Sequence, residues 1–413
     1  MTSAKQQSAF WFTVLVAASL LMITMGARQS QGLFVSPLNT ATGLGIASIS
    51  LAMAIGQFVW GATQPIAGAV ADRYGPGRVL AVGAIVLALG WAITPLMSSN
   101  FGLIVSIGIL TAAGAGAGSF SVLIGAAAQR LPAENRGMAA GIINAGGSFG
   151  QFIFAPLLQK LISVLGWMGS MWSMAVISLF ALPLAWLLRK KQVANTSTGA
   201  AIEPKVAEKP LKTAIYEALQ DRSYLLLHAG FFTCGFHIAF LITHLPIEVA
   251  LCGLPPNVAS WSLAIIGLAN IIGSLAVGWG VGHYRSKYIL FWMYASRTVM
   301  VGLYLLAPKT DITFYIFAAG LGLTWLATVP PTAGVVGKLF GTRYLSTLFG
   351  LTLLSHQIGG FFGAWLGGIA ITRQGNYDWM WYADMALALA AALCNLPIRE
   401  ARITKRAASL KPA

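Results

Sequence analysis

The stretch GAVADRYGPGR, residues 68–78, follows the second long apolar segment of the chain. A related stretch, GWGVGHYRSK at residues 278–287, follows the eighth such segment, about half a chain length later. A second set of positions recurs at nearly the same offset: Gly141, Gly150 and Phe152 match Gly350, Gly359 and Phe361. Repeats of this length in a very apolar chain predict a duplicated membrane bundle, a fold that places its substrate site between the two halves.

The composition supports a membrane protein. The 413 residues are 57% hydrophobic and 9% charged, with a mean hydropathy of +0.74, whereas soluble domains carry roughly 25% charged residues. Apolar runs of the length that spans a bilayer recur along the whole chain. We predict an all-α membrane protein with twelve transmembrane helices in two pseudo-symmetric six-helix bundles, at about residues 9–33, 46–71, 78–97, 101–129, 137–165, 169–188, 223–247, 257–281, 288–308, 312–338, 345–372 and 379–398.

The domain boundaries follow from a polar interruption near the middle of the chain. We expect an N-terminal six-helix bundle at residues 1–190, a cytoplasmic linker at 191–222, a C-terminal six-helix bundle at 223–400 and a cytoplasmic tail at 401–413. Within the linker, residues 211–219 have the pattern of a short amphipathic helix.

The net charge of +15 first suggests a nucleic-acid partner, but the distribution of the basic residues favours another explanation. Apart from Arg28 and Arg297 in apolar segments and Lys160, Lys309 and Arg373 in one set of alternate loops, they lie in the other set of loops and in the two tails. This is the positive-inside bias of a polytopic protein in the cytoplasmic (inner) membrane with both termini in the cytoplasm. We therefore expect a lipid bilayer and no nucleic acid as partner, and a monomer.

Twelve spans, a six-plus-six repeat and the Gly-x-x-x-Asp-Arg-Tyr-Gly-x-x-Arg signature after the second span resemble the major facilitator superfamily. The resemblance implies that Asp72 is a latch, which pairs with an arginine or a helix terminus and closes the cytoplasmic side, while Arg73 and Arg78 lie at the lipid headgroups. The second copy has Gly282 in place of Asp72, which implies a weaker latch there. The alternative is an ordinary basic loop without a gating role.

Within that superfamily, residues 26–38 and 136–141 are similar to bacterial monocarboxylate and oxalate/formate-type carriers. One departure matters. Those carriers typically have an arginine in the eighth span between an Asp or Asn and the loop glycine, where this chain has Asn270, Ser274 and Gly278. A lactate-type mechanism therefore does not carry over as a whole.

Two arginines lie within apolar spans, where ionisable groups are costly and usually functional. Arg297 is near the middle of the ninth span and Arg28 is in the outer half of the first. Of the eleven Asp and Glu residues, only Glu248 and Asp384 approach the membrane interior. Because arginine binds carboxylates through two hydrogen bonds, an excess of buried positive charge predicts a small organic anion as substrate. The alternatives are interfacial snorkelling for Arg28 and a structural ion pair or a clamp on carbonyl groups for Arg297.

Uncharged polar residues also recur at helical spacing within the spans, which predicts faces turned toward protein or water. As substrate-binding residues we predict Arg28, Gln31, Asn144, Gln151, Asn270, Arg297, His356 and Gln357. For proton coupling we predict His237, His244 and Asp384, because histidine changes charge near neutral pH and Asp384 is a carboxylate inside a span. Hydrogen bonding between helices is the alternative for each of the uncharged residues.

An enzyme is not expected. Residues 146–150 fit the G-x-S-x-G pattern but lie inside an apolar helix, whereas a nucleophile elbow needs a strand-to-helix turn. The chain has no phosphate-binding Walker loop, and its three widely spaced cysteines fit neither a disulfide framework nor a metal site, so we expect no cofactor and no metal.

The leading hypothesis is a secondary carrier of a small organic anion that works by rocker-switch alternating access, with proton coupling or anion exchange. The alternative is an exporter of amphipathic or cationic compounds, for which Asp384 would be decisive. A non-transporting sensor would need an additional cytoplasmic domain.

Overall fold

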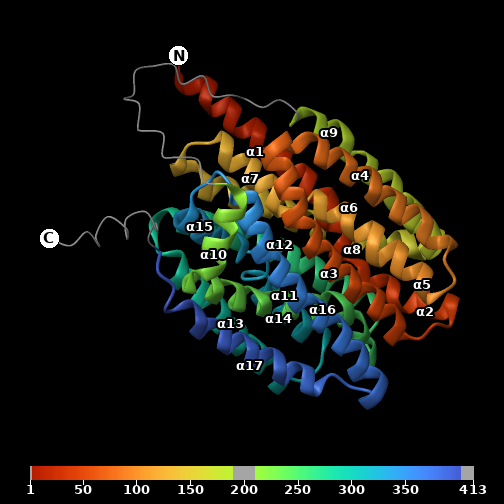
Figure 1. Ribbon diagram of the computed structural model, residues 1–413. Helices are drawn as coiled ribbons and strands as arrows, with labels where there is room; N and C mark the ends of the chain where they lie inside the picture. Colours follow the sequence, from red (N-terminus) through yellow and green to blue (C-terminus); the bar gives the residue numbers. More distant parts are fainter. Residues whose placement is uncertain (1, 189–209, 401–413) are drawn as a thin grey trace.

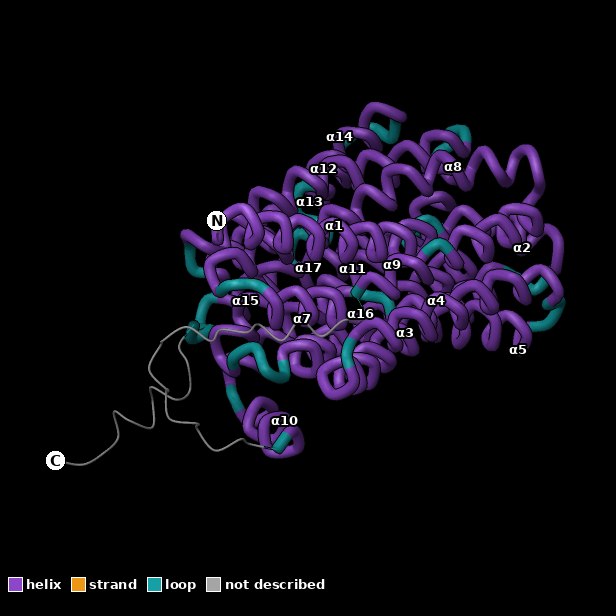
Figure 2. Tube along the Cα trace, turned by 90° about the horizontal axis from the view of Figure 1, so that it is seen from above, coloured by secondary structure: helices purple, strands orange, loops and turns teal. Residues whose placement is uncertain are grey.

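The computed structural model describes residues 2–188 and 210–400, and these residues form helices and connecting segments without a strand (Figures 1 and 2). The first half consists of α1 (Thr2–Arg28), η1 (Gln31–Phe34), α2 (Val35–Thr42), α3 (Ile46–Tyr74), α4 (Pro76–Ile93), η2 (Thr94–Leu96), α5 (Asn100–Leu103), η3 (Ile104–Thr111), α6 (Ala112–Ala117), α7 (Phe120–Arg130), η4 (Ala133–Asn135), α8 (Arg136–Leu179) and α9 (Ala181–Leu187). The second half consists of α10 (Leu211–Gln220), α11 (Arg222–Leu251), α12 (Pro256–His283), α13 (Ser286–Leu306), α14 (Asp311–Gly322), α15 (Val329–Phe340), α16 (Leu345–Gln374) and α17 (Asp378–Asn395).

These helices provide the twelve membrane crossings that the sequence predicts. Eight segments of the described chain are long and apolar enough to span a bilayer. One of them, Arg136–Leu187, is 52 residues long and turns at Gly166, whose φ is 71°, so it crosses twice. The interrupted pair α14 and α15, the 30-residue α16 and the 18-residue α17 complete the set. An 18-residue helix is about 27 Å long, close to the hydrocarbon thickness.

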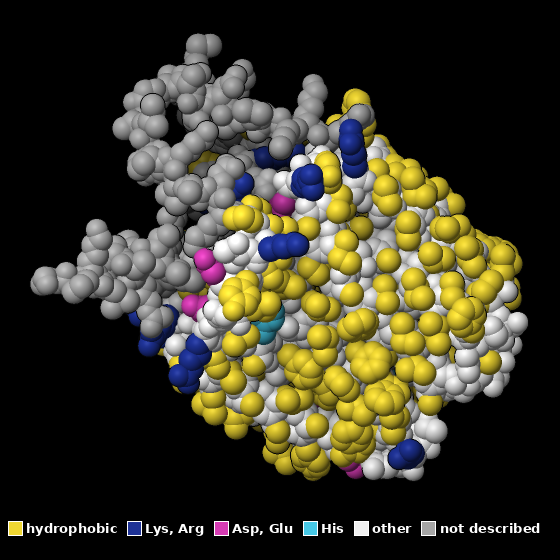
Figure 3. Space-filling view, viewed as in Figure 1, with side chains coloured by type: hydrophobic (Ala, Val, Ile, Leu, Met, Phe, Trp, Pro, Cys, Tyr) yellow, Lys and Arg dark blue, Asp and Glu magenta, His cyan; other side chains and the backbone are white. Residues whose placement is uncertain are grey.

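The outer surface fits a lipid environment. In the space-filling view, apolar side chains cover the broad flank and most Lys and Arg side chains lie toward one end (Figure 3). Large side chains such as Trp292, Ile66 and Val82 are more than 60% exposed. In water such a surface would favour aggregation, whereas a bilayer covers it with acyl chains.

The two halves are separate groups of helices that meet along two seams. Within the first half α1 and α4 pack against α8, and within the second half α11 packs against α16 and α13 against α17. Between the halves, α3 packs along α16 and α8 packs along α12. Figure 1 shows the first half in red to olive and the second in green to blue. The predicted helix at residues 211–219 is present as α10, while most of the predicted linker and the predicted tail at 401–413 lie outside the described residues.

Glycine allows the backbones to approach closely at both seams. A Cβ atom on Gly141 of α8 would lie 2.8 Å from the Ser274 carbonyl oxygen of α12. On the other seam, a Cβ atom on Gly350 of α16 would lie 2.9 Å from the backbone of Pro65. A larger residue at either site would hold the halves apart, so these glycines permit the contact that closes the bundle.

The tenth span is interrupted at residues 323–328, between α14 and α15. Pro330 and Pro331 follow the interruption, and a proline has no N–H to donate to the carbonyl group four residues earlier. The carbonyl groups of Leu326 and Ala327 therefore lose their usual helical donors. In a bilayer such groups need partners from the protein, and Asn144 bonds the Leu326 carbonyl, as described below.

Candidate substrate site

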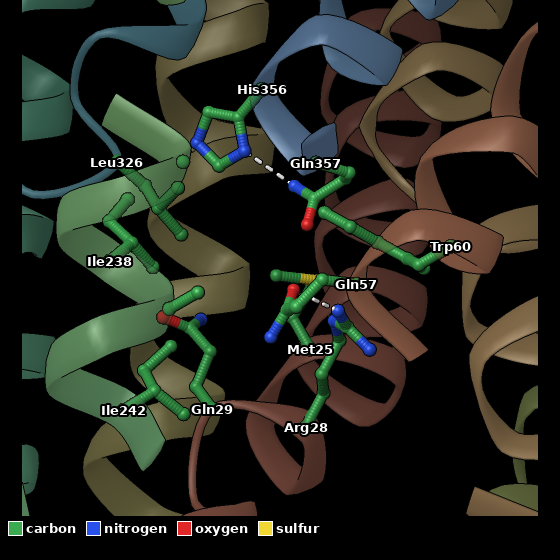
Figure 4. A pocket seen from close by; sticks show the side chains of 12 residues that line it. Met25, Arg28, Gln29, Gln57, Trp60, Ile238, Ile242, Leu326, His356 and Gln357 are labelled. Carbon is green, nitrogen blue, oxygen red and sulfur yellow. Dashed lines mark hydrogen bonds between the residues drawn. The ribbon is translucent and has the colours of Figure 1, made fainter. Parts of the chain in front are cut away.

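A pocket lies between the two halves and takes its walls from both. The space between its lining residues, counted together with the part that is open to the surroundings, is about 340 Å³. The first half provides residues of α1 and α3, and the second provides residues of α11, α16 and the interruption of the tenth span (Figure 4). The lining residues are Met25, Arg28, Gln29, Gln57, Trp60, Gly235, Ile238, Ala239, Ile242, Leu326, His356 and Gln357.

Arg28 is the charged group of this pocket. It is the last residue of α1 and is 6% exposed. Its guanidinium donates a hydrogen bond to Gln57 Oε1 and lies 4.5 Å from the ring centroid of Trp60. No carboxylate in the described part of the chain forms an ion pair with Arg28. The guanidinium is thus held by an amide oxygen and an aromatic face, and its charge remains uncompensated.

Further hydrogen-bond donors line the same space. Gln29 Nε2, Trp60 Nε1 and His356 Nε2 are buried and have no partner among residues 2–188 and 210–400. Gln357 Nε2 lies 2.5 Å from His356 Nδ1; because an amide nitrogen only donates, Nδ1 accepts and Nε2 carries the imidazole hydrogen. Figure 4 shows His356 and Gln357 across the pocket from Arg28. A pocket with one cation and several free donors is suited to an anion.

The structure brings together three of the eight residues that the sequence suggests for substrate binding. Arg28, His356 and Gln357 line the pocket, while Gln31, Asn144, Gln151, Asn270 and Arg297 are not among its lining residues. Sequence reasoning missed Gln29, Gln57 and Trp60. A signal for Gln57 exists, because Ser50, Gln57 and Gln64 recur every seven residues along α3 and are all buried.

Asn144 and Asn270 lie on the seam between α8 and α12 and hold the interruption of the tenth span. Asn144 Nδ2 donates to Ser274 Oγ at 2.7 Å and to the Leu326 carbonyl at 2.8 Å. Asn270 Nδ2 donates to Ser148 Oγ at 2.6 Å, and its Oδ1 accepts from the backbone N–H groups of Leu326 and Ala327 at 3.2 and 3.0 Å. These amides replace the helical hydrogen bonds that the interruption removes. Ser274, which stands where the similar carriers have arginine, takes part in this network.

Arg297 has the geometry of a clamp on carbonyl groups. It is 1% exposed and donates to the carbonyl oxygens of Thr324 and Trp325. It also donates to Cys234 Sγ at 3.2 Å. The guanidinium thus satisfies acceptors of the interrupted segment from the side of α13 and does not reach the pocket lining.

The other two predicted binding residues lie in buried positions outside the lining. Gln31 is in η1 and is 7% exposed. Gln151 of α8 is fully buried, and neither end of its side chain has a hydrogen-bond partner within the described chain. The structure therefore assigns neither residue to the pocket wall.

The three residues predicted for proton coupling fall into two groups. His237 Nδ1 lies 2.5 Å from Asp384 Oδ2, and both side chains are buried. His244 is bonded at both ring nitrogens, with Nε2 2.7 Å from the Ala364 carbonyl and Nδ1 3.0 Å from the Tyr377 hydroxyl. Of these two groups, only the first pairs a histidine with a carboxylate.

Comparison with known proteins identifies the family. The family model described as Major Facilitator Superfamily matches residues 16–364. The chain belongs to the major facilitator superfamily. It is therefore an integral membrane transporter and not an enzyme.

Superfamily members with related sequences cover nearly the whole chain. "Monocarboxylate transporter 13" of Rattus norvegicus is 27% identical over 397 residues, which are 94% of this chain and 89% of that protein. "Oxalate:formate antiporter" of Oxalobacter formigenes is 24% identical over 411 residues, which are 97% and 95% of the two chains. The solved structure of the proton:xylose symporter XylE bound to 6-bromo-6-deoxy-D-glucose has the same fold, with a TM-score of 0.69 at 13% identity over 95% of this chain and 94% of that one.

The superfamily signature after the second span lies where the two halves meet. Asp72 accepts hydrogen bonds from the backbone N–H of Thr347 at 3.3 Å and from its hydroxyl at 3.0 Å, at the N-terminus of α16. Gln129 of α7 also donates to Asp72, at 2.9 Å. A carboxylate at a helix N-terminus is favoured by the helix dipole. Arg73 and Arg78 are exposed beside this contact, and we call this the Asp72 end of the bundle.

Replacement of Asp72 by alanine is expected to open the Asp72 end. Hydrogen bonds to a charged group contribute about 1.5–3 kcal/mol each, so loss of the contact with Thr347 shifts the population toward separated halves. A cysteine introduced at Ala67, which is 6% exposed in α3, should react with a maleimide at least about fivefold faster in the Asp72→Ala background. The same replacement at the exposed Asp311 is the control. Equal labelling rates with and without the Asp72 carboxylate would show that the contact is not a latch.

Proposed function

We propose that this transporter carries a small organic anion with a carboxylate group across the cytoplasmic membrane by rocker-switch alternating access. Transport is driven by cotransported protons or by exchange for another anion, and both chain termini lie on the cytoplasmic side. Arg28 holds the carboxylate, and the free donors of Gln29, Trp60 and His356 orient it. Asp72 closes one end of the path.

The observation that carries this proposal is the uncompensated charge of Arg28 in a pocket between the halves. A buried cation without a counter-ion is costly, and a carboxylate ligand relieves that cost through paired hydrogen bonds to the guanidinium. Another part of the wall is apolar, because Ile238, Ile242 and Leu326 line it. The pocket thus suits a small molecule with one charged end and a short apolar part. The names of two relatives, a monocarboxylate transporter and an oxalate:formate antiporter, agree with this substrate class.

The alternative is an exporter of cationic compounds. A cation needs a free carboxylate, but no Asp or Glu is among the pocket lining. Asp384, the acid that would be decisive, is bonded to His237. If Asp384→Asn abolished transport of an organic cation such as tetraphenylphosphonium, this alternative would replace the anion proposal.

A thermal-shift screen of the purified protein tests the proposal. We expect formate, lactate, pyruvate or oxalate to raise the melting temperature, because a ligand at 100 times its Kd stabilises the folded state by about 2.7 kcal/mol. Lactamide and oxamide, which have nearly the same shape without the charge, are the matched controls and should give no shift. A shift with tetraphenylphosphonium and none with any carboxylate would contradict the proposal.

A further inference from the structure

A chain of contacts leads from the pocket to a buried ionisable pair on the far side of the interrupted span. Gln29 lines the pocket, and its Oε1 accepts a hydrogen bond of 3.0 Å from Trp325 Nε1. The Trp325 ring lies with its centroid 5.7 Å from that of His237. His237 Nδ1 is 2.5 Å from Asp384 Oδ2. One tryptophan ring therefore separates the anion pocket from the histidine–carboxylate pair.

This pair has an open position for one proton. His237 is 1% and Asp384 is 0% exposed, and they come from different helices, α11 and α17. With Nδ1 donating to the carboxylate, Nε2 is left with a lone pair, and it has no partner in the described chain. Asp384 Oδ1 has none either. A buried ionisable pair is costly in a membrane protein and is usually retained for a function.

The charges around the pair are nearly balanced. Arg297 of α13 interacts electrostatically with Asp384, so a neutral His237 leaves the cluster without net charge. The other titratable side chains on the surrounding helices are Cys234 of α11, Tyr294 of α13 and His356 of α16. Glu248 and Tyr304 bond each other farther along α11 and α13, at 2.8 Å. A proton on His237 Nε2 would therefore give the cluster a net charge of about +1.

We propose that the His237–Asp384 pair is the proton-binding site that couples proton movement to anion binding in the neighbouring pocket. This inference rests on the proposed anion function. A proton taken from water binds His237 Nε2, Asp384 stabilises the imidazolium that forms, and the added positive charge attracts the anion next to Arg28. Unit charges roughly 10 Å apart in a protein interior change each other's binding by about tenfold. Anion and proton thus bind cooperatively, and the carrier is a proton–anion symporter whose proton site lies outside the substrate pocket.

The test compares two transport modes in the same proteoliposomes, with radiolabelled lactate and oxalate as probes. In the wild-type protein an acidic exterior should drive accumulation, up to about tenfold per unit of pH difference for one proton per anion. His237→Gln and Asp384→Asn should lose this accumulation, because neither retains the proton site. Exchange of external for internal anion should continue in both variants, which also shows that they are folded.

The affinity for the probe gives a second readout that a structural role would not affect. In the wild-type protein the Kd should fall as the pH is lowered, whereas in His237→Gln it should be independent of pH. Asp378→Asn, an exposed carboxylate of the same helix, and His283→Gln, an exposed histidine, are the matched controls and should behave as wild type.

The outcomes separate this inference from the proposed function. The proton site would be overturned if the wild type exchanged anions without proton-driven accumulation. It would also be overturned if accumulation persisted in both His237→Gln and Asp384→Asn. The proposed anion carrier would stand in either case. Absence of any lactate or oxalate transport by the wild type, at every pH tested, would overturn the proposed function and this inference with it.

Discussion

Replacement of Arg28 by glutamine should strongly weaken anion binding without destabilising the protein. Loss of one partner from a buried, hydrogen-bonded charge pair costs about 2–5 kcal/mol of binding free energy, or about 30-fold or more in affinity. The folded protein loses only a bond to Gln57 and the contact with the Trp60 ring. Because it also loses an uncompensated buried charge, its melting temperature in the absence of anion should be equal to that of the wild type or higher. Thermal melting with and without lactate and oxalate, together with uptake in proteoliposomes, measures both effects.

Two further variants sharpen this prediction. Arg28→Lys keeps the charge but loses the planar fork that binds a carboxylate with two hydrogen bonds, so its affinity should lie between those of the wild type and the glutamine variant. Arg373→Gln removes an exposed arginine and should leave binding and melting unchanged. If Arg28→Gln still bound and transported the anions normally, Arg28 would not be the anion site.

Replacement of Arg297 by glutamine should have the opposite effect and lower the stability of the protein. Its guanidinium satisfies the carbonyl groups of Thr324 and Trp325 and bonds Cys234. Removal leaves buried acceptors and Asp384 without their cation, for which we expect a cost of about 3–5 kcal/mol. Differential scanning fluorimetry without ligand should show a much lower melting temperature, and transport should fall because Trp325 and the pocket wall lose their support.

Two further variants test whether the loss of stability comes from the missing bonds between Arg297 and the carbonyl groups. An ammonium group cannot bond two carbonyl oxygens in the fixed geometry of a guanidinium, so Arg297→Lys should recover only part of the stability. Arg373→Gln is again the matched control. A glutamine variant that melts at the wild-type temperature but does not bind anions would show that Arg297 acts in binding and not as a clamp.

The sequence was sufficient for the fold. Apolar runs, the repeated loop signature and the basic loops predicted the twelve crossings, because each crossing depends on length and hydrophobicity that a single segment displays. It also indicated Arg28 as a candidate, because a cation in the outer half of a span and the small number of acids within the spans are visible in the sequence. The helix at 211–219 was predicted from its own periodicity.

The role of Arg297 could not be read in the same way. It depends on the interruption at residues 323–328, whose free carbonyl groups happen to face α13. Pro330 and Pro331 signal that interruption, but no local pattern tells which distant side chain will satisfy it. Asn144 and Asn270 illustrate the same limit: a polar stripe on a membrane helix shows that it faces protein or water, and only the packing of α8 on α12 shows which.

The clamp by Arg297 has a consequence for the medium in which the carrier works. Many discontinuous membrane helices expose carbonyl oxygens that coordinate a dissociable ion such as sodium. In this chain the positive charge belongs to Arg297, a residue of the ninth span. An arginine side chain stays protonated at any physiological pH. The carbonyl groups of Thr324 and Trp325 therefore need no dissolved cation as their partner.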